Sequence, residues 1–279
     1  MRHRIVVAIL ALAVVLAFAA PALGAPAAKA ASPKLTVFAA ASLNHVFPAM
    51  VPAFKKANPK YKNAKFVWNF QGSDTLLAQI QAGATFDVYA AASTKYGNLA
   101  STGGFTVQPV NFCQNRLVVI IPRSNPDRIH VLQDLTKPGC MIAIGDSAVP
   151  IGTYTRTVLT NLSKDPAYGS DYSAKVLANV VANCTNVSAV VALVVIKEVD
   201  AGFVYKSDAQ YVAQTVQQIT IPDAFQTNPL PTYPIAIAKT TTNSALAQSW
   251  VNFVQSKKGQ AIMLQYGFLP KPVVAPATP

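Results

Sequence analysis

The sequence predicts an α/β protein with two lobes, because short apolar strands alternate with amphipathic helices along the chain. Small and hydroxyl-bearing residues join a strand to a helix at four places. Two apolar runs, residues 113–121 and 233–238, each follow a proline-containing loop, and we interpret them as crossings between lobes. The first lobe is then residues 32–112 with residues 230–272, and the second lobe is residues 113–229.

The first strand–helix junction is the segment LTVFAAASL, residues 35–43. An apolar run meets three alanines and then Ser42, and Val46, Met50 and Phe54 follow at helical spacing. The first amides of a helix lack intrahelical partners and carry the positive end of the helix dipole, so such a turn favours an anion. For Ser42 taken alone, an ordinary N-cap is the alternative.

The same construction recurs at residues 66–83, 140–159 and 179–205. In each segment a β-prone run meets a turn of small or hydroxyl residues, and a helix follows. In the last segment the helix is predicted to run to about Val199, and a further strand ends at Tyr205. Four such turns, three of them without Lys or Arg, indicate an anion site built from neutral groups.

The two ends of the chain carry predictions of their own. Residues 1–30 have the pattern of a cleavable secretory signal, with basic Arg2 and Arg4, an apolar core and an A-x-A site that ends at Ala30. No cysteine lies near that site, so the sequence shows no lipid-attachment signature. We expect an exported, soluble, periplasmic protein with a disordered tail at residues 273–279.

The formal net charge of +12 attracts anions in general. Its basic residues are scattered along the chain and form no Arg-rich helix, so we do not expect nucleic acid as a partner. The spacing of Cys113, Cys140 and Cys184 fits no zinc site. The sequence allows two alternatives, one disulfide with a remaining thiol or three buried free thiols.

An enzyme is the main alternative class. Ser42 and His45 lie three residues apart, where they would share a helix face, and a Ser–His pair invites a hydrolase interpretation. The sequence has no G-x-S-x-G elbow and no acid placed to orient His45. We therefore expect no enzymatic activity and no cofactor.

Five segments together resemble the periplasmic molybdate-binding proteins of ABC importers, which belong to the type II solute-binding proteins. The segments are residues 37–43, 70–93, 115–122, 145–154 and 186–209. The resemblance implies the type II periplasmic-binding-protein fold, in which each lobe is a mixed sheet flanked by helices and the ligand lies in the cleft between lobes.

The resemblance also implies the ligand contacts. The oxyanion would be held by the hydroxyls of Ser42, Ser73 and Tyr205 and by the amides of Ile151 and Val187, with no direct bond from the protein to molybdenum. The protein would be a monomer that delivers molybdate, and tungstate, to an inner-membrane ABC permease.

The third turn departs from the family pattern. It is one residue shorter than usual and carries Ile151 where a small residue is typical, so the donor between Pro150 and Gly152 stays open. Another oxyanion such as sulfate, phosphate or chromate is the first alternative ligand, and a ferric-ion-binding relative is the second.

Overall fold

The computed structural model describes residues 32–271, so the predicted signal and the predicted tail lie outside the described residues. The strands in this range are β1 (Lys34–Ala40), β2 (Lys65–Gln71), β3 (Val88–Ala90), β4 (Val110–Gln114), β5 (Leu117–Pro122), β6 (Ile142–Gly145), β7 (Val180–Cys184), β8 (Ala201–Tyr205), β9 (Val216–Thr220) and β10 (Thr232–Ile237). The helices are α1 (Val46–Ala57), α2 (Ser73–Gln81), α3 (Thr94–Thr102), α4 (Pro150–Leu162), α5 (Tyr172–Ala178), α6 (Val187–Val195), α7 (Lys206–Tyr211), α8 (Ser244–Gln255) and α9 (Lys257–Gln265).

The strands form two mixed sheets of the same design. The first has the order β2-β1-β3-β10-β4, and the second has the order β7-β6-β8-β5-β9. In each sheet three neighbouring strands are parallel, and the fourth strand in the order pairs antiparallel with both of its neighbours. The chain passes from the first sheet to the second between β4 and β5 and returns between β9 and β10. The predicted mixed sheets flanked by helices are confirmed.

The register brings the ends of the parallel strands together. In the first sheet Ala40 pairs with Gln71, at the carboxyl ends of β1 and β2. In the second sheet Gly145 pairs with Cys184, at the carboxyl ends of β6 and β7. The turns that follow these strands therefore lie side by side at one edge of each sheet, which is where ligands bind in open α/β sheets.

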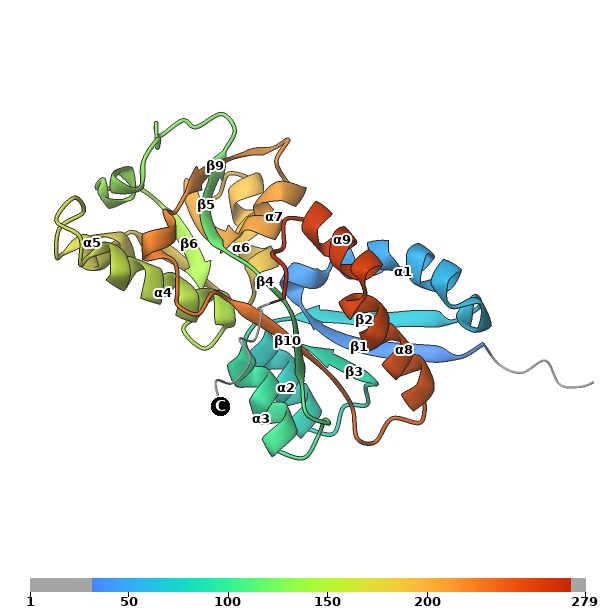
Figure 1. Ribbon diagram of the computed structural model, residues 1–279. Coiled ribbons are helices and arrows are strands. Elements are labelled where there is room, and N and C mark those ends of the chain that lie inside the picture. The colour runs from blue at the N-terminus through green and yellow to red at the C-terminus, as the bar shows by residue number, and fades with distance from the viewer. Residues whose placement is uncertain (1–31, 272–279) are drawn as a thin grey trace, which may run out of the picture. The chain divides into compact units, whose positions relative to one another are not determined.

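Helices cover both sheets (Figure 1). Apolar side chains of α1 and α8 pack with one face of β1, and those of α2 and α3 pack with Phe38 on its other face. Helices α4 and α6 contact β6, and α7 contacts β5 and β8. Burial on both faces explains why the inner strands are almost continuously apolar. Within residues 32–271 the structure has no helix that is long and apolar enough to cross a membrane.

Two local predictions need correction. Ser42 lies in a short 3-10 turn, Ala41–Leu43, and α1 begins only at Val46. Helix α6 ends at Val195 and not near Val199, because Lys197 takes a positive φ of 64° that no helix accommodates.

The three cysteines form no disulfide. All three lie in the described chain, and each thiol is free and buried.

Candidate functional site

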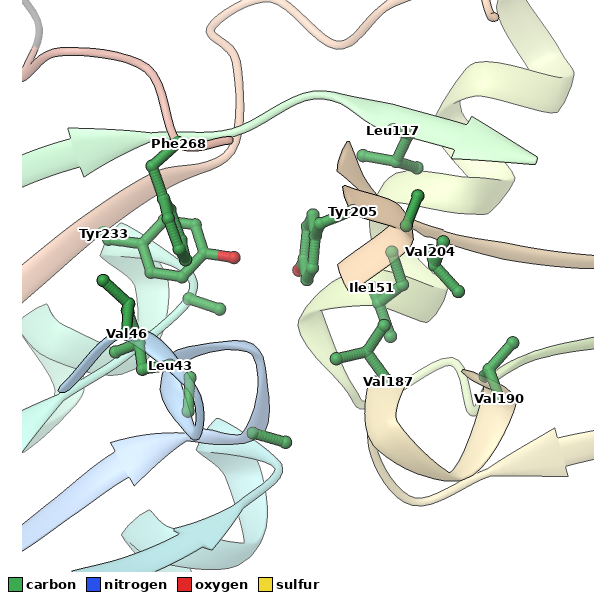
Figure 2. Packing of buried hydrophobic residues seen from close by; sticks show 14 of the residues in the cluster. Leu43, Val46, Leu117, Ile151, Val187, Val190, Val204, Tyr205, Tyr233 and Phe268 are labelled. Atoms are coloured by element: carbon green, nitrogen blue, oxygen red, sulfur yellow. The ribbon is translucent and has the colours of Figure 1, made fainter. Parts of the chain in front are cut away.

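A small pocket lies where the carboxyl ends of the parallel strands of the two sheets meet. Both sheets contribute to it through the turns after their strands. The residues that line it are Ala40, Ala41, Ser42, Gln71, Gly72, Ser73, Ala92, Val149, Pro150, Ile151, Asn186, Val187 and Tyr205. This set contains every site residue that the sequence predicts. Figure 2 shows Ile151, Val187 and Tyr205 on one side of the gap, opposite Leu43, Val46 and Tyr233 on the other.

Both serines are buried, and each oxygen already has one partner within the protein. The Oγ of Ser73 accepts a hydrogen bond of 3.0 Å from the backbone amide of Ala92. The Oγ of Ser42 lies 3.0 Å from the hydroxyl of Tyr233. A serine oxygen that accepts one hydrogen bond still has its own proton to donate. The serine hydroxyls can therefore act as donors to a ligand in the pocket.

Two helix N-termini supply amides on the other side of the pocket. Helix α4 begins at Pro150, which has no N–H, so Ile151 carries the first free amide of that helix. The start of α4 packs closely on the end of β6, and a Cβ at Gly152 would overlap the carbonyl oxygen of Gly145. Pro150 and Ile151 line the pocket, and Gly152 is not among the lining residues.

Helix α6 is capped by Asn186, whose side-chain oxygen accepts a hydrogen bond of 3.1 Å from the amide of Ala189. The cap satisfies the third amide of the helix and leaves the first one, that of Val187, directed out of the helix end. Both Asn186 and Val187 line the pocket.

Tyr205 ends β8 and is only 1% exposed. Its hydroxyl is buried and has no hydrogen-bond partner among the described residues. Burial raises the pKa of this hydroxyl well above its usual range, so it keeps its proton at neutral pH. A buried hydroxyl without a partner is unfavourable by about 1–3 kcal/mol, which a ligand that accepts its proton would offset.

The residues that line the pocket include no charged side chain. Burial raises the pKa of Tyr205 and of Tyr233, and the negative charge of Asp208, on α7, adds to both shifts. Asp208 is itself buried, and burial raises its pKa to about 7. Within residues 32–271 no three His, Cys, Asp or Glu side chains are grouped so that they could hold a metal ion.

Two hydrogen bonds join segments that follow strands of the first sheet to segments that follow strands of the second. The Tyr96 hydroxyl donates to the carbonyl oxygen of Ala148. The side-chain amide of Asn44 donates to the Oγ of Ser188 at 3.3 Å. The structure is therefore a closed form, in which both sides of the pocket touch.

The arrangement does not support the Ser–His pair of a hydrolase. The hydroxyl of Ser42 pairs with Tyr233, whereas the ring of His45 stacks on Tyr211 with 3.3 Å between ring centroids. Ser42 and His45 therefore do not form the hydrogen-bonded pair that a serine hydrolase requires.

Sequence reasoning missed Tyr233 and Asp208. Tyr233 lies 191 residues from Ser42 in the chain and reaches it only because β10 returns to the first sheet. Its place in the apolar run 233–238 was visible, but a single tyrosine in a strand is ordinarily packing. Asp208 follows the predicted Tyr205 by one helical turn, and that spacing was the available signal.

Comparison with known proteins gives a consistent result. The molybdate-binding protein ModA of Mycobacterium tuberculosis strain H37Rv is 34% identical over 249 residues, which cover 87% of this chain and 89% of that protein. The structure of the periplasmic molybdate-binding protein of Azotobacter vinelandii matches with a TM-score of 0.70 at 19% identity, covering 85% of this chain and 100% of that one. The sulfate-binding protein SubI from Mycobacterium tuberculosis H37Rv matches with a TM-score of 0.72 at 17% identity, covering 88% of each chain.

At these identities the two structural matches show the fold alone. A family model described as bacterial extracellular solute-binding protein matches residues 35–269, which is most of the chain and includes every residue that lines the pocket. The chain belongs to the family of bacterial extracellular solute-binding proteins.

Proposed function

We propose that this protein captures molybdate outside the cytoplasm and delivers it to an ABC permease. The observation that carries the proposal is the pocket itself, which neutral hydrogen-bond donors line from both sheets and whose buried Tyr205 hydroxyl has no partner within the described residues. The relative in Mycobacterium tuberculosis that is 34% identical is named for molybdate binding, which supports the choice of ligand.

The donor set of the proposed site is the hydroxyls of Ser42, Ser73 and Tyr205 with the amides of Ile151 and Val187. A dianion that leaves water for a closed pocket needs several preorganised donors, because burying its charge uncompensated is prohibitive. A site made only of donors also rejects hydrogen phosphate, since the P–OH proton would lack an acceptor.

Tungstate has the same charge and a similar tetrahedral shape, so we include it as a second ligand. We further propose that the protein is a monomer without enzymatic activity, and that it is released into the periplasm after cleavage of residues 1–30. The division into moving lobes, residues 32–112 with 230–272 and residues 113–229, stays a prediction. The sheets themselves change between Gln114 and Leu117 and again between Thr220 and Thr232.

Sulfate is the second candidate ligand, because it shares the charge and shape of molybdate and the fold is shared with a sulfate-binding protein. The two anions differ in size, so the closed pocket must discriminate by fit. Calorimetric titration of the unaltered protein with molybdate, tungstate, sulfate and phosphate tests the proposal. We expect one bound molybdate per chain, tungstate of comparable affinity, and sulfate and phosphate at least a hundredfold weaker, on the order of 3 kcal/mol. Sulfate binding as tight as molybdate binding would refute the molybdate assignment.

A further inference from the structure

We propose that Tyr233 is a positioning residue, whose hydroxyl donates to the Oγ of Ser42 and thereby turns the Ser42 proton toward the bound oxyanion. The inference rests on the proposed function, because it concerns how one donor of that site is oriented. Tyr233 itself does not line the pocket. It would therefore act through Ser42 and not by touching the ligand.

The geometry holds the Tyr233 hydroxyl in one place. Tyr233 is 0% exposed, and its ring makes edge contacts with Phe112 and Phe268, with centroid distances of 6.2 and 5.6 Å. Its hydroxyl oxygen lies 3.0 Å from the Oγ of Ser42, and Figure 2 shows it directed across the gap toward Tyr205. A ring packed on both sides cannot swing away, so the contact with Ser42 is a fixed part of the site.

The count of protons decides the direction of this hydrogen bond. A serine hydroxyl has a single proton and two lone pairs, and a fully ionised oxyanion offers acceptors only. If Ser42 donated to Tyr233, its lone pairs would face the anion and repel it. Ser42 is useful as a ligand donor only when Tyr233 donates to it. Burial raises the pKa of Tyr233 well above its usual range, so the proton needed for this is present at neutral pH.

Ser73 is arranged in the same way as Ser42, with its oxygen accepting a hydrogen bond from the protein. The Oγ of Ser73 accepts from the amide of Ala92, a donor that cannot reverse, and its proton is left for the ligand. Each serine oxygen of the pocket thus accepts a hydrogen bond from the protein, from a backbone amide at Ser73 and from a tyrosine hydroxyl at Ser42. Tyr205 is the other tyrosine beside Tyr233, at a centroid distance of 5.9 Å. Its hydroxyl makes no hydrogen bond of acceptable geometry in the described chain, although the Tyr233 side chain is close enough to contribute to its raised pKa. Tyr205 can therefore donate to the ligand while Tyr233 serves Ser42.

A double-mutant cycle with Tyr233→Phe and Ser42→Ala, read by calorimetric titration with molybdate, tests the inference. We expect Tyr233→Phe alone to weaken binding about threefold to tenfold, the range of one neutral hydrogen bond. In the Ser42→Ala background the same change should have no effect within about twofold, because the group that Tyr233 orients is gone. Tyr172→Phe is the matched control, since it removes a buried hydroxyl bonded to the Leu132 carbonyl at 2.7 Å, away from the pocket.

A second readout separates positioning from general packing. Without the Tyr233 hydroxyl, a lone pair of Ser42 becomes available to a ligand proton, so the preference for molybdate over hydrogen phosphate should fall in Tyr233→Phe and not in Tyr172→Phe. Unchanged affinity in Tyr233→Phe, or losses that add in the double variant, would overturn the inference while leaving the proposed function in place. If the unaltered protein failed to bind molybdate, the proposed function would fall and this inference with it.

Discussion

At the scale of single residues, the pocket is a set of hydroxyls and amides that can donate their protons, and the two serine oxygens each have a partner within the protein. Ser73 accepts a hydrogen bond from the Ala92 amide, and Ser42 shares one with Tyr233, which we propose is the donor. Tyr205 has no partner in the described part of the chain. Such a site gains hydrogen bonds when an anion enters and loses none, which is why individual hydroxyls should matter.

Replacing either serine by alanine should weaken molybdate binding by about 1.5–3 kcal/mol, the usual range for a hydrogen bond to a charged partner. The Ser73→Ala change also leaves the buried Ala92 amide unpaired, so it should lower the free energy of unfolding by about 1–3 kcal/mol as well. Titration calorimetry and urea unfolding measure the two effects. Ser249→Ala, on the exposed side of α8, is the control. If both pocket variants bound molybdate as tightly as the unaltered protein, these serines would not belong to the site.

Asp208 should make the protein less stable as the pH rises. Its pKa is about 7 in the folded protein and about 3.9 in an unfolded chain, so between these values the folded state binds more protons. The free energy of unfolding must then fall as the pH rises through this window, in total by something on the order of 4 kcal/mol, and level off above pH 7. Asp208→Asn should abolish most of this slope.

Urea unfolding of both proteins at pH 5 and pH 8 measures the slope. We expect the Asn variant to gain stability relative to the unaltered protein at pH 8 and not at pH 5. Parallel behaviour at both pH values would show that the carboxyl stays ionised in the folded state.

At the scale of secondary-structure elements, the site depends on where strands end. Every predicted site residue follows a parallel strand by a few positions or ends one, and this local pattern could be read from the sequence. The strand that ends at Tyr205 is confirmed, and so is a helix after the turn that follows β2, although this helix begins at Ser73, which the sequence places in the turn. Tyr233 could not be predicted as a neighbour of Ser42, because that contact comes from pairing β10 with β3 and β4, far away in sequence. The early end of α6 was hidden because Lys197, not glycine, takes the left-handed conformation.

Gly72, the N-cap of α2, is an element boundary with little room for a side chain. A Cβ at this position would lie 2.5 Å from the Oδ1 of Asp74, a side chain that can shift, and 2.6 Å from the carbonyl oxygen of Thr185, which belongs to the other side of the pocket. The backbone conformation of Gly72 suits alanine, so Gly72→Ala should fold and yet be unable to close fully. We expect molybdate affinity to fall at least tenfold, with a melting temperature close to that of the unaltered protein when both are unliganded. Tight binding by Gly72→Ala would mean that the closed contact is not needed.

At the scale of the whole molecule, the donors are divided between two sheets that only two segments of the described residues 32–271 connect. Contacts such as Tyr96 with Ala148 and Asn44 with Ser188 hold the two sides together in this closed form. The donors can surround an anion only when both sides meet. The ligand should therefore favour the closed form over more open ones.

Ligand-driven closure should be visible in two ways. The radius of gyration from small-angle scattering should decrease when molybdate is added. The stability should rise by about 2.7 kcal/mol at a hundredfold excess of molybdate over its dissociation constant, if the unfolded chain does not bind it. A radius that does not change despite tight binding would mean that the free protein is already closed.

The residues that line the pocket carry no charged side chain. The forces that attract the anion to the protein therefore differ from those that hold it once it is bound. Without Arg2, Arg4 and Lys29 of the segment that we propose is cleaved, the net charge is 20 minus 11, or +9. This charge acts at long range through solvent, where salt screens it within about 10 Å at 0.1 M. Salt ions do not enter a closed pocket, so they do not weaken the hydrogen bonds inside it. Added sodium chloride should therefore slow the association of molybdate severalfold and leave its dissociation rate nearly constant, as stopped-flow measurement at several ionic strengths would show. A dissociation rate that rose in step with salt would place a charged group in contact with the bound anion.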